Sequence, residues 1–467
     1  MKIPTLIGSS LLGIILFISP LLDGSWDIWA KTIVHLISAV LIILLIISQH
    51  PKNLFKKPLI IPLTLFSLIL LSTYLSHIPF NSEVELHNWL NYLIIFIAVL
   101  LIPQEYLYKI LSYFVLIVTL LVFMAYYQVF IAHEAMPDVT LINPNIFAGY
   151  LLLAIPLLYY VQKDRPLIQK NLITILIVFA FFALILTKSI SSMIAILVAV
   201  AITRYRWKGI IGSMVIIAIL LIFKLMEPDV ANRLLWWKSS IEIIKETPLF
   251  GTGIGTFELV YPKFKTGSLH SIFAHSYYLQ FASEAGIIGV SIFLSFVVYL
   301  FTKIKEKSLK IAFLAILLQN AIDYSLYIPA NGILFWFIVA IIIKNISESN
   351  NNSNLTRNNV LFIRIIIVFL ICVYVNGVLT IYNSTKVYNL GEASYQSGDI
   401  ISAEKYFIQT KIMKPNFWLS YKYLMKINMN KFAKTKYISY LNEALIESEN
   451  TKKYNPYHEY YYAKKIN

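Results

Sequence analysis

The sequence predicts an all-helical, polytopic membrane protein with one large extracytoplasmic loop and a small helical domain at its carboxyl end. Of its 467 residues, 58% are apolar and 13% are charged, a balance that a single soluble core does not accommodate. Uncharged stretches near twenty residues recur along the chain, and this is the length a helix needs to cross about 30 Å of hydrocarbon. One long polar stretch, 226–276, interrupts them.

The apolar stretches predict about thirteen membrane-spanning helices. The first continues past Pro20 without a small-residue cleavage site, so we expect it to be kept as a span. The expected spans centre near Ile15, Val40, Phe66, Ile95, Ile117, Leu153, Val178, Leu197, Ile217, Ser291, Leu317, Phe337 and Val368.

Lysine and arginine gather in alternate short connections, which predicts the orientation because such connections stay in the cytoplasm. The amino terminus is therefore expected inside, and the loop 226–276 and the carboxyl end outside. The net charge of +15 lies largely in these connections and in the tail, which makes nucleic acid an improbable partner. The cationic connections contain Lys52, Lys56 and Lys57; Lys163, Arg165 and Lys170; Arg204, Arg206 and Lys208; and Lys303, Lys305, Lys307 and Lys310.

The sequence has few residues of the types that bind metal ions or redox groups. Cys372 is the single cysteine, so neither an intramolecular disulfide nor a thiolate metal site can form. The eight histidines include no HExxH pair, and His270 and His275 are five apart rather than one helical turn. We therefore expect no metal site and no cofactor.

The composition changes at Tyr382, which divides the chain into a polytopic domain, 1–382, and a soluble extracytoplasmic region, 383–467. In the second, Gly391, Ala403, Phe407 and Pro415 fall at the offsets of a tetratricopeptide-like repeat of about 34 residues. A single repeat does not bury its own face, so the pattern predicts docking on another surface or a protein partner. The alternative is an amphipathic helical tail whose lysines lie along membrane lipid.

The loop 226–276 begins with an expected amphipathic helix, since Leu234, Trp237 and Ile241 recur at steps of three and four. Pro248 is expected to end it. The GTGIG segment that follows lets the backbone turn tightly and expose amides to a ligand, although a simple turn explains it equally well. Tyr261 then belongs to an aromatic surface that would stack on a sugar or contact lipid headgroups.

Two residues of this loop fit group transfer to a hydroxyl. His275 stands before the next span, where a neutral imidazole would act as a general base; the alternative is a polar cap on the helix. Arg233 carries a guanidinium that can grip two phosphate oxygens, or else it anchors an interfacial helix as a snorkelling cation.

Polar residues inside predicted spans indicate a functional cavity, because they are costly against lipid. Glu284, Asn320 and Asp323 are the candidates, and Asn320 and Asp323 are expected three apart on one helix face. The alternative is that they hold neighbouring helices together by hydrogen bonds.

Arg233 followed by tryptophan, then PLFGTGIGTF, YPKF and AHSYYLQFASEAGIIG, resembles the signature of the O-antigen ligase and polymerase superfamily in order and spacing. LINPNIFAGYLLLAIPL and QNAIDYSLYIPANGILFW resemble further spans of that family, so the similarity covers roughly 74–340. The resemblance implies inverting transfer of a glycan from an undecaprenyl diphosphate lipid at the outer face of the bacterial inner membrane, without metal or nucleotide sugar. It implies that His275 activates the acceptor hydroxyl and that Arg233 stabilises the diphosphate.

The chain departs from the family pattern at two positions. The residue after the histidine is usually asparagine and here is Ser276. The pattern TxSRG appears as TKSIS, so Ile190 replaces an arginine; Lys188, two residues away, would supply the lost cation at the substrate.

Three functions therefore compete. The first is a ligase that moves a glycan onto lipid A core or a similar saccharide. The second is a polymerase or a protein O-oligosaccharyltransferase of the same superfamily. The third is a polysaccharide transporter or flippase, which would be expected to show internal repeats of spans, and none is evident.

Overall fold

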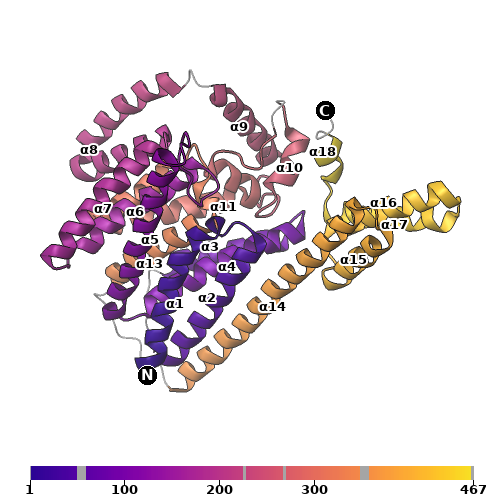
Figure 1. Cartoon of the computed structure of the whole chain (residues 1–467), viewed down its shortest axis with the longest axis horizontal. Helices are drawn as coiled ribbons and strands as arrows, with labels where there is room; N and C mark the ends of the chain where they lie inside the picture. The colour runs from indigo at the N-terminus through magenta and orange to yellow at the C-terminus, as the bar shows by residue number, and fades with distance from the viewer. Residues whose placement is uncertain (1, 50–58, 225–227, 267–269, 348–356, 464–467) are drawn as a thin grey trace.

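The chain is described by a computed structural model over residues 2–49, 59–224, 228–266, 270–347 and 357–463. Within these ranges it is helical and contains no β-strand, which confirms the predicted fold class. Figure 1 shows the long helices gathered into one bundle, with the carboxyl-terminal helices beside it.

The helices follow the predicted spans closely in order. Two of them, α9 and α10, lie in the predicted loop. The bounds are α1 Lys2–Leu21, α2 Ile28–Ser48, α3 Ile60–Tyr74, α4 Pro79–Leu101, α5 Gln104–Phe130, α6 Pro144–Gln162, α7 Leu167–Leu186, α8 Ile190–Lys224, α9 Pro228–Glu246, α10 Phe257–Phe264, α11 Tyr277–Lys303, α12 Lys307–Gln319, α13 Pro329–Ser347, α14 Arg357–Gln396, α15 Ile400–Met413, α16 Trp418–Thr435, α17 Ile438–Tyr454 and α18 His458–Ala463.

In the described ranges, nine helices are long and apolar enough to cross a membrane, fewer than the thirteen spans expected. Two expected spans, centred at Leu197 and Ile217, fall within the single helix α8. A Cβ on Gly209 would lie 2.0 Å from the carbonyl oxygen of Ala201, eight residues earlier. A straight helix separates such residues by about 12 Å, so α8 bends sharply between them.

Burial separates the centre of the bundle from its lipid-facing rim. The apolar windows of α6 and α13 are 78% and 83% buried, whereas those of α7 and α14 are only 22% and 17% buried. A helix that is apolar all round and also buried belongs at the centre of a bundle. The connection between α12 and α13 therefore leads directly into one of the innermost helices of the bundle.

Two of the four predicted cationic connections meet at one end of the bundle. Lys163, after α6, forms an ion pair with Glu306, before α12. At the same end, the Lys344 ammonium donates to the carbonyl oxygen of Val99 at 3.1 Å, and Arg364 donates to that of Gln49 at 3.2 Å. Two of the four predicted connections are thus brought together, while Lys52, Lys56 and Lys57 lie outside the described residues.

The predicted domain boundary near Tyr382 falls inside α14, which continues for 40 residues without a break. Figure 1 shows α14 leaving the end of the bundle that carries the amino terminus and reaching α15–α17 beyond the bundle. Beyond the boundary, α14–α17 pack in sequence around Tyr388, Phe407, Phe417 and Leu424. The division into two domains and the tetratricopeptide-like repeat stay predictions.

The carboxyl-terminal helices dock on the rest of the chain. Phe417 packs on Phe80 of α4 with ring centroids 4.0 Å apart, and the Asn416 amide donates to Glu83 at 2.7 Å. The Tyr457 hydroxyl lies 2.8 Å from Nδ1 of His77, and its ring joins an apolar cluster with Val260 of α10. The carboxyl-terminal helices therefore dock on a surface formed by the loop 226–276 and the start of α4.

Replacing Tyr457 with alanine is expected to loosen this docking. The ring is 5% exposed, and removing a buried aromatic side chain costs about 3–5 kcal/mol. Hydrogen exchange should become faster in α10 and α18. Tyr460, 43% exposed in α18 three residues after Tyr457, provides the control, since Tyr460→Ala should leave exchange unchanged. Equal exchange in the wild type and in Tyr457→Ala would contradict the docking.

Candidate functional site

His275 lies in the loop directly before α11, and its backbone is left-handed, with φ of +50°. That conformation is uncommon for a residue other than glycine, and such strain gathers at functional sites. Ser276 caps α11 by accepting a hydrogen bond from the Leu279 amide at 3.5 Å. Serine and asparagine are comparable helix caps, so the departure from the family pattern at Ser276 preserves this local structure.

The His275 imidazole lies between two aromatic rings. Trp236 of α9 stacks on it, with centroids 4.6 Å apart and planes 22° apart, and Tyr324 meets it edge-on at 4.9 Å. Trp237 donates from Nε1 to the His275 carbonyl oxygen at 3.2 Å. Nδ1 is buried and has no hydrogen-bond partner in the described part of the chain. The ring is thus held in position by its neighbours, and its buried Nδ1 is left without a hydrogen-bond partner from the described residues.

Burial, followed by the nearby Arg233 guanidinium, lowers the pKa of His275 to about 4. The imidazole is therefore neutral at ordinary pH, which is the state a general base requires. Because the folded pKa lies below the ordinary value of 6.5, this group's contribution to stability is lost as the pH falls from about 6.5 to about 4.

Arg233 is half-buried on α9, and its Nη1 donates to the carbonyl oxygen of Ile322 at 2.6 Å. A guanidinium has five N–H donors, so this bond leaves others for an anion. The structure thus brings together the two residues that the sequence singled out, 42 positions apart in the chain. The guanidinium lies close enough to act on the charge of the imidazole.

Asn320 and Asp323 do not share a helix face, because α12 ends at Gln319 and both residues belong to the following buried connection. Their carbonyl oxygens both accept from the Tyr277 amide at 2.9 Å. The Asn320 side chain accepts from the Leu326 amide at 3.0 Å, and Asp323 accepts from the Tyr324 amide at 2.8 Å. These bonds shape the connection that presents the Ile322 carbonyl and the Tyr324 ring. Substrate binding by either residue stays a prediction.

Glu284 is buried in α11, two residues before the break in that helix at Gly286. Its carboxylate accepts from the Phe257 amide at 3.3 Å, from Gln280 at 3.2 Å and from the Tyr327 hydroxyl at 3.2 Å. These three hydrogen bonds offset the free-energy cost of burying the carboxylate. They favour a role in joining α11 to the loop, and direct substrate contact stays a prediction.

The GTGIG segment fills the break in α11. Gly286 has φ of +74° and ψ of 179°, and the amides of Thr252 and Gly253 donate to the carbonyl oxygens of Ser283 and Glu284 at 3.0 and 2.9 Å. A Cβ on Gly251 would lie 2.4 Å from the Glu284 carbonyl oxygen. These two amides bond to the protein's own helix, which favours the turn interpretation.

Tyr261 is 1% exposed in α10, where its ring stacks on Phe257 with centroids 5.4 Å apart. Burial raises the pKa of its hydroxyl to about 12, while a hydrogen bond with Trp236 opposes that shift. The ring thus connects the docking cluster of the carboxyl-terminal helices to the tryptophan that stacks on His275. Its predicted contact with a sugar stays a prediction.

Lys188 is exposed in the turn between α7 and α8, with φ of +53°. Beside it, the hydroxyl of Ser189 lies 3.2 Å from that of Ser191 and 2.9 Å from that of Ser192. In the described part of the chain, no ion pair or hydrogen bond of the Lys188 ammonium joins it to Arg233 or His275. Compensation for the arginine replaced at Ile190 stays a prediction.

Three residues at the site escaped sequence reasoning as site residues: Trp236, Tyr324 and Asn143. Asn143 caps α6 and donates from Nδ2 to the Tyr324 hydroxyl at 2.8 Å. Trp236 and Asn143 lie in segments that carried the family resemblance, RLLWW and LINPN, and this was the available signal. Trp236 and Tyr324 meet at the His275 ring, and Asn143 bonds to Tyr324, so the arrangement depends on contacts between distant segments.

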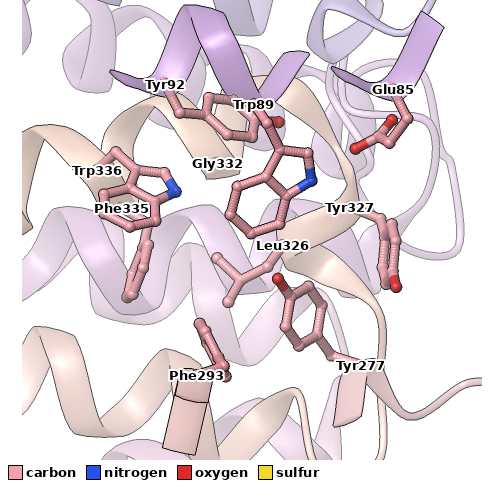
Figure 2. A pocket seen from close by; sticks show the side chains of 10 residues that line it. All are labelled: Glu85, Trp89, Tyr92, Tyr277, Phe293, Leu326, Tyr327, Gly332, Phe335 and Trp336. Carbon is pink, nitrogen blue, oxygen red and sulfur yellow. The ribbon is translucent and has the colours of Figure 1, made fainter. Parts of the chain in front are cut away.

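An aromatic cavity lies behind the site, between α4, α11 and α13. Figure 2 shows Trp89 and Tyr92 on one side and Tyr277 and Phe293 on the other, with Glu85 at one edge. Its volume is about 10 Å³, enough for roughly one water molecule. The cavity is therefore too small for a sugar ring.

Comparison with known proteins matches part of the chain to a family model. Residues 175–294 match the family model described as O-antigen ligase, and the match runs through α9, the glycine segment and His275. No curated protein sequence matches the chain. Members of the matched family are glycosyltransferase-like enzymes that use lipid-linked glycans and saccharide acceptors. Over these residues, about a quarter of the chain, the sequence is thus similar to the O-antigen ligase family.

Proposed function

We propose that the chain transfers a glycan from undecaprenyl diphosphate to an acceptor hydroxyl at the outer face of the bacterial inner membrane. The observation that carries the proposal is the pairing of a neutral, fixed imidazole with a guanidinium at the mouth of α11. The imidazole suits a hydroxyl as nucleophile, and the guanidinium suits a diphosphate as leaving group.

In the proposed reaction, the acceptor oxygen attacks the anomeric carbon of the donor glycan while His275 takes the hydroxyl proton. The bond between that carbon and the phosphate oxygen breaks, and undecaprenyl diphosphate leaves with the electron pair. Arg233 stabilises the charge that develops on the diphosphate. No step requires a metal, a nucleotide sugar or another cofactor.

The test is transfer by the purified protein from undecaprenyl diphosphate glycan, without added metal or nucleotide. Lipid A core is the acceptor expected for a ligase, a second donor molecule for a polymerase, and an exported protein for an O-oligosaccharyltransferase. Product on any of them supports transfer and names the acceptor class. Folded protein that binds donor but releases no diphosphate carrier would contradict the proposal, and movement of intact donor across vesicles would favour a flippase.

The carboxyl-terminal helices favour a large acceptor over water. Their docking cluster reaches Trp236 through Tyr261, so an acceptor held by these helices would lie next to the loop that carries the site. A protein acceptor or partner fits this arrangement as well as a saccharide does, and the three acceptors above distinguish them.

Arg233→Gln is expected to raise the pKa of His275 from about 4 towards its ordinary value of 6.5, because the guanidinium is the second cause of the lowering. Burial, the first cause, remains. NMR titration of the His275 imidazole without donor measures the change. Lys238→Gln removes an equal charge from an exposed position on the same helix and should leave the titration unchanged. An unchanged titration in Arg233→Gln would show that the two groups are not coupled.

A further inference from the structure

A second cavity, of about 500 Å³, lies at the end of α11 opposite His275. The connection from α11 to α12 forms one wall, and the end of α13 forms another. Since α11 has 27 residues, about 40 Å of helix separates this cavity from the site. We call it the lysine cavity, after Lys303 and Lys305, which line it.

The lysine cavity carries a positive charge that no ion pair in the described part of the chain neutralises. Lys303 and Lys305 are exposed, and neither forms an ion pair within the described residues. Glu306, the acidic residue among those that line the cavity, is already paired with Lys163 and accepts from the Ser308 hydroxyl at 2.9 Å. Glu306 also caps α12, whose amino-terminal end carries the positive pole of the helix dipole.

The remaining wall is apolar. Ile304, Leu309 and Ile342 line the cavity and are buried within the protein at 6%, 1% and 2% exposure. Cations beside an apolar wall at the ends of spanning helices match the two parts of a phospholipid, a charged headgroup and acyl chains. Basic pockets between spanning helices commonly bind anionic headgroups.

We propose that the lysine cavity binds an anionic phospholipid, with Lys303 and Lys305 contacting the headgroup phosphate and Ile346, a partly exposed residue of the same lining, contacting an acyl chain. The site is separate from the transfer site and does not depend on the proposed reaction. It would hold the ends of α11, α12 and α13 together at the membrane surface away from His275.

The test uses the full-length protein in detergent, with dioleoyl phosphatidylglycerol or dioleoyl phosphatidylcholine added and bound lipid counted by native mass spectrometry. The wild type should retain phosphatidylglycerol preferentially. The double variant Lys303→Ala/Lys305→Ala should lose roughly 30-fold in affinity for it. Lys303→Arg/Lys305→Arg should retain the preference, because the charges remain.

Lys109→Ala/Lys170→Ala is the matched control, since it removes two exposed lysines that do not line the cavity. An equal loss in the control, or equal retention of phosphatidylcholine by the wild type, would overturn the proposal. Displacement of the lipid by an equal concentration of inorganic phosphate would assign the cavity to a soluble anion and would likewise overturn it.

Discussion

His275→Ala should lower the rate of glycan transfer by about 10²–10⁴-fold, the usual contribution of a positioned general base. The fall should appear in kcat rather than in KM for the donor, because the imidazole acts on the acceptor proton. Initial rates with purified, lipid-linked donor measure both. The reason is structural as well as chemical: Trp236 and Tyr324 hold the ring in place, and its buried Nδ1 has no protein partner in the described residues.

His270→Ala is the control, since His270 is an exposed histidine of the same loop. It should transfer at close to the wild-type rate. If His275→Ala keeps the full rate while the protein inserts and elutes as the wild type does, the general-base assignment is wrong. Loss of donor binding together with rate would instead indicate that the imidazole holds the diphosphate.

Gly286→Ala should produce the largest loss of stability, on the order of 3–5 kcal/mol. A Cβ there would lie 2.0 Å from the carbonyl oxygen of Leu249, and both are backbone-bound atoms that cannot rotate away. The residue also has φ of +74° and ψ of 179°, a conformation essentially restricted to glycine. Thermal unfolding in detergent should show a melting temperature lowered by several degrees, or no folded protein.

Gly212→Ala is the matched control, because a Cβ at Gly212 meets nothing within 4 Å. Alanine there should be neutral or slightly stabilising, since it has the higher helix propensity. Gly251→Ala tests the same contact from the other side and should resemble Gly286→Ala. Normal melting of both Gly286→Ala and Gly251→Ala would show that the loop does not dock into the break of α11.

Local pattern predicted much of the fold. The apolar stretches located the helices, and the steps of three and four from Leu234 to Ile241 predicted α9, which ends at Glu246, just before Pro248. The apolar pattern gave a wrong prediction where the chain leaves a helix and changes direction. It kept Asn320 and Asp323 on one helix face, whereas α12 ends at Gln319. Polar caps and bends depend on which segment packs alongside.

The candidate site was predicted by residue type and by resemblance, but not in its geometry. A motif can contain both Arg233 and His275 without showing that one lowers the pKa of the other. The contact from Asn143 to Tyr324 spans 181 positions, and the one from Tyr327 to Glu284 joins a short connection to a broken helix. Such pairs follow from tertiary packing, which no local window of sequence contains.

The length of α14 determines how far the carboxyl-terminal helices lie above the membrane surface. Forty helical residues extend about 60 Å, twice the thickness of the hydrocarbon core, so about half of the helix projects from the bilayer. The helix has no internal break, and near its far end Tyr388 stacks on Phe417, which in turn packs on Phe80 of α4. The carboxyl-terminal helices are therefore held at a fixed distance from the lipid surface. A bulky molecule bound to them has to extend over that distance to reach His275.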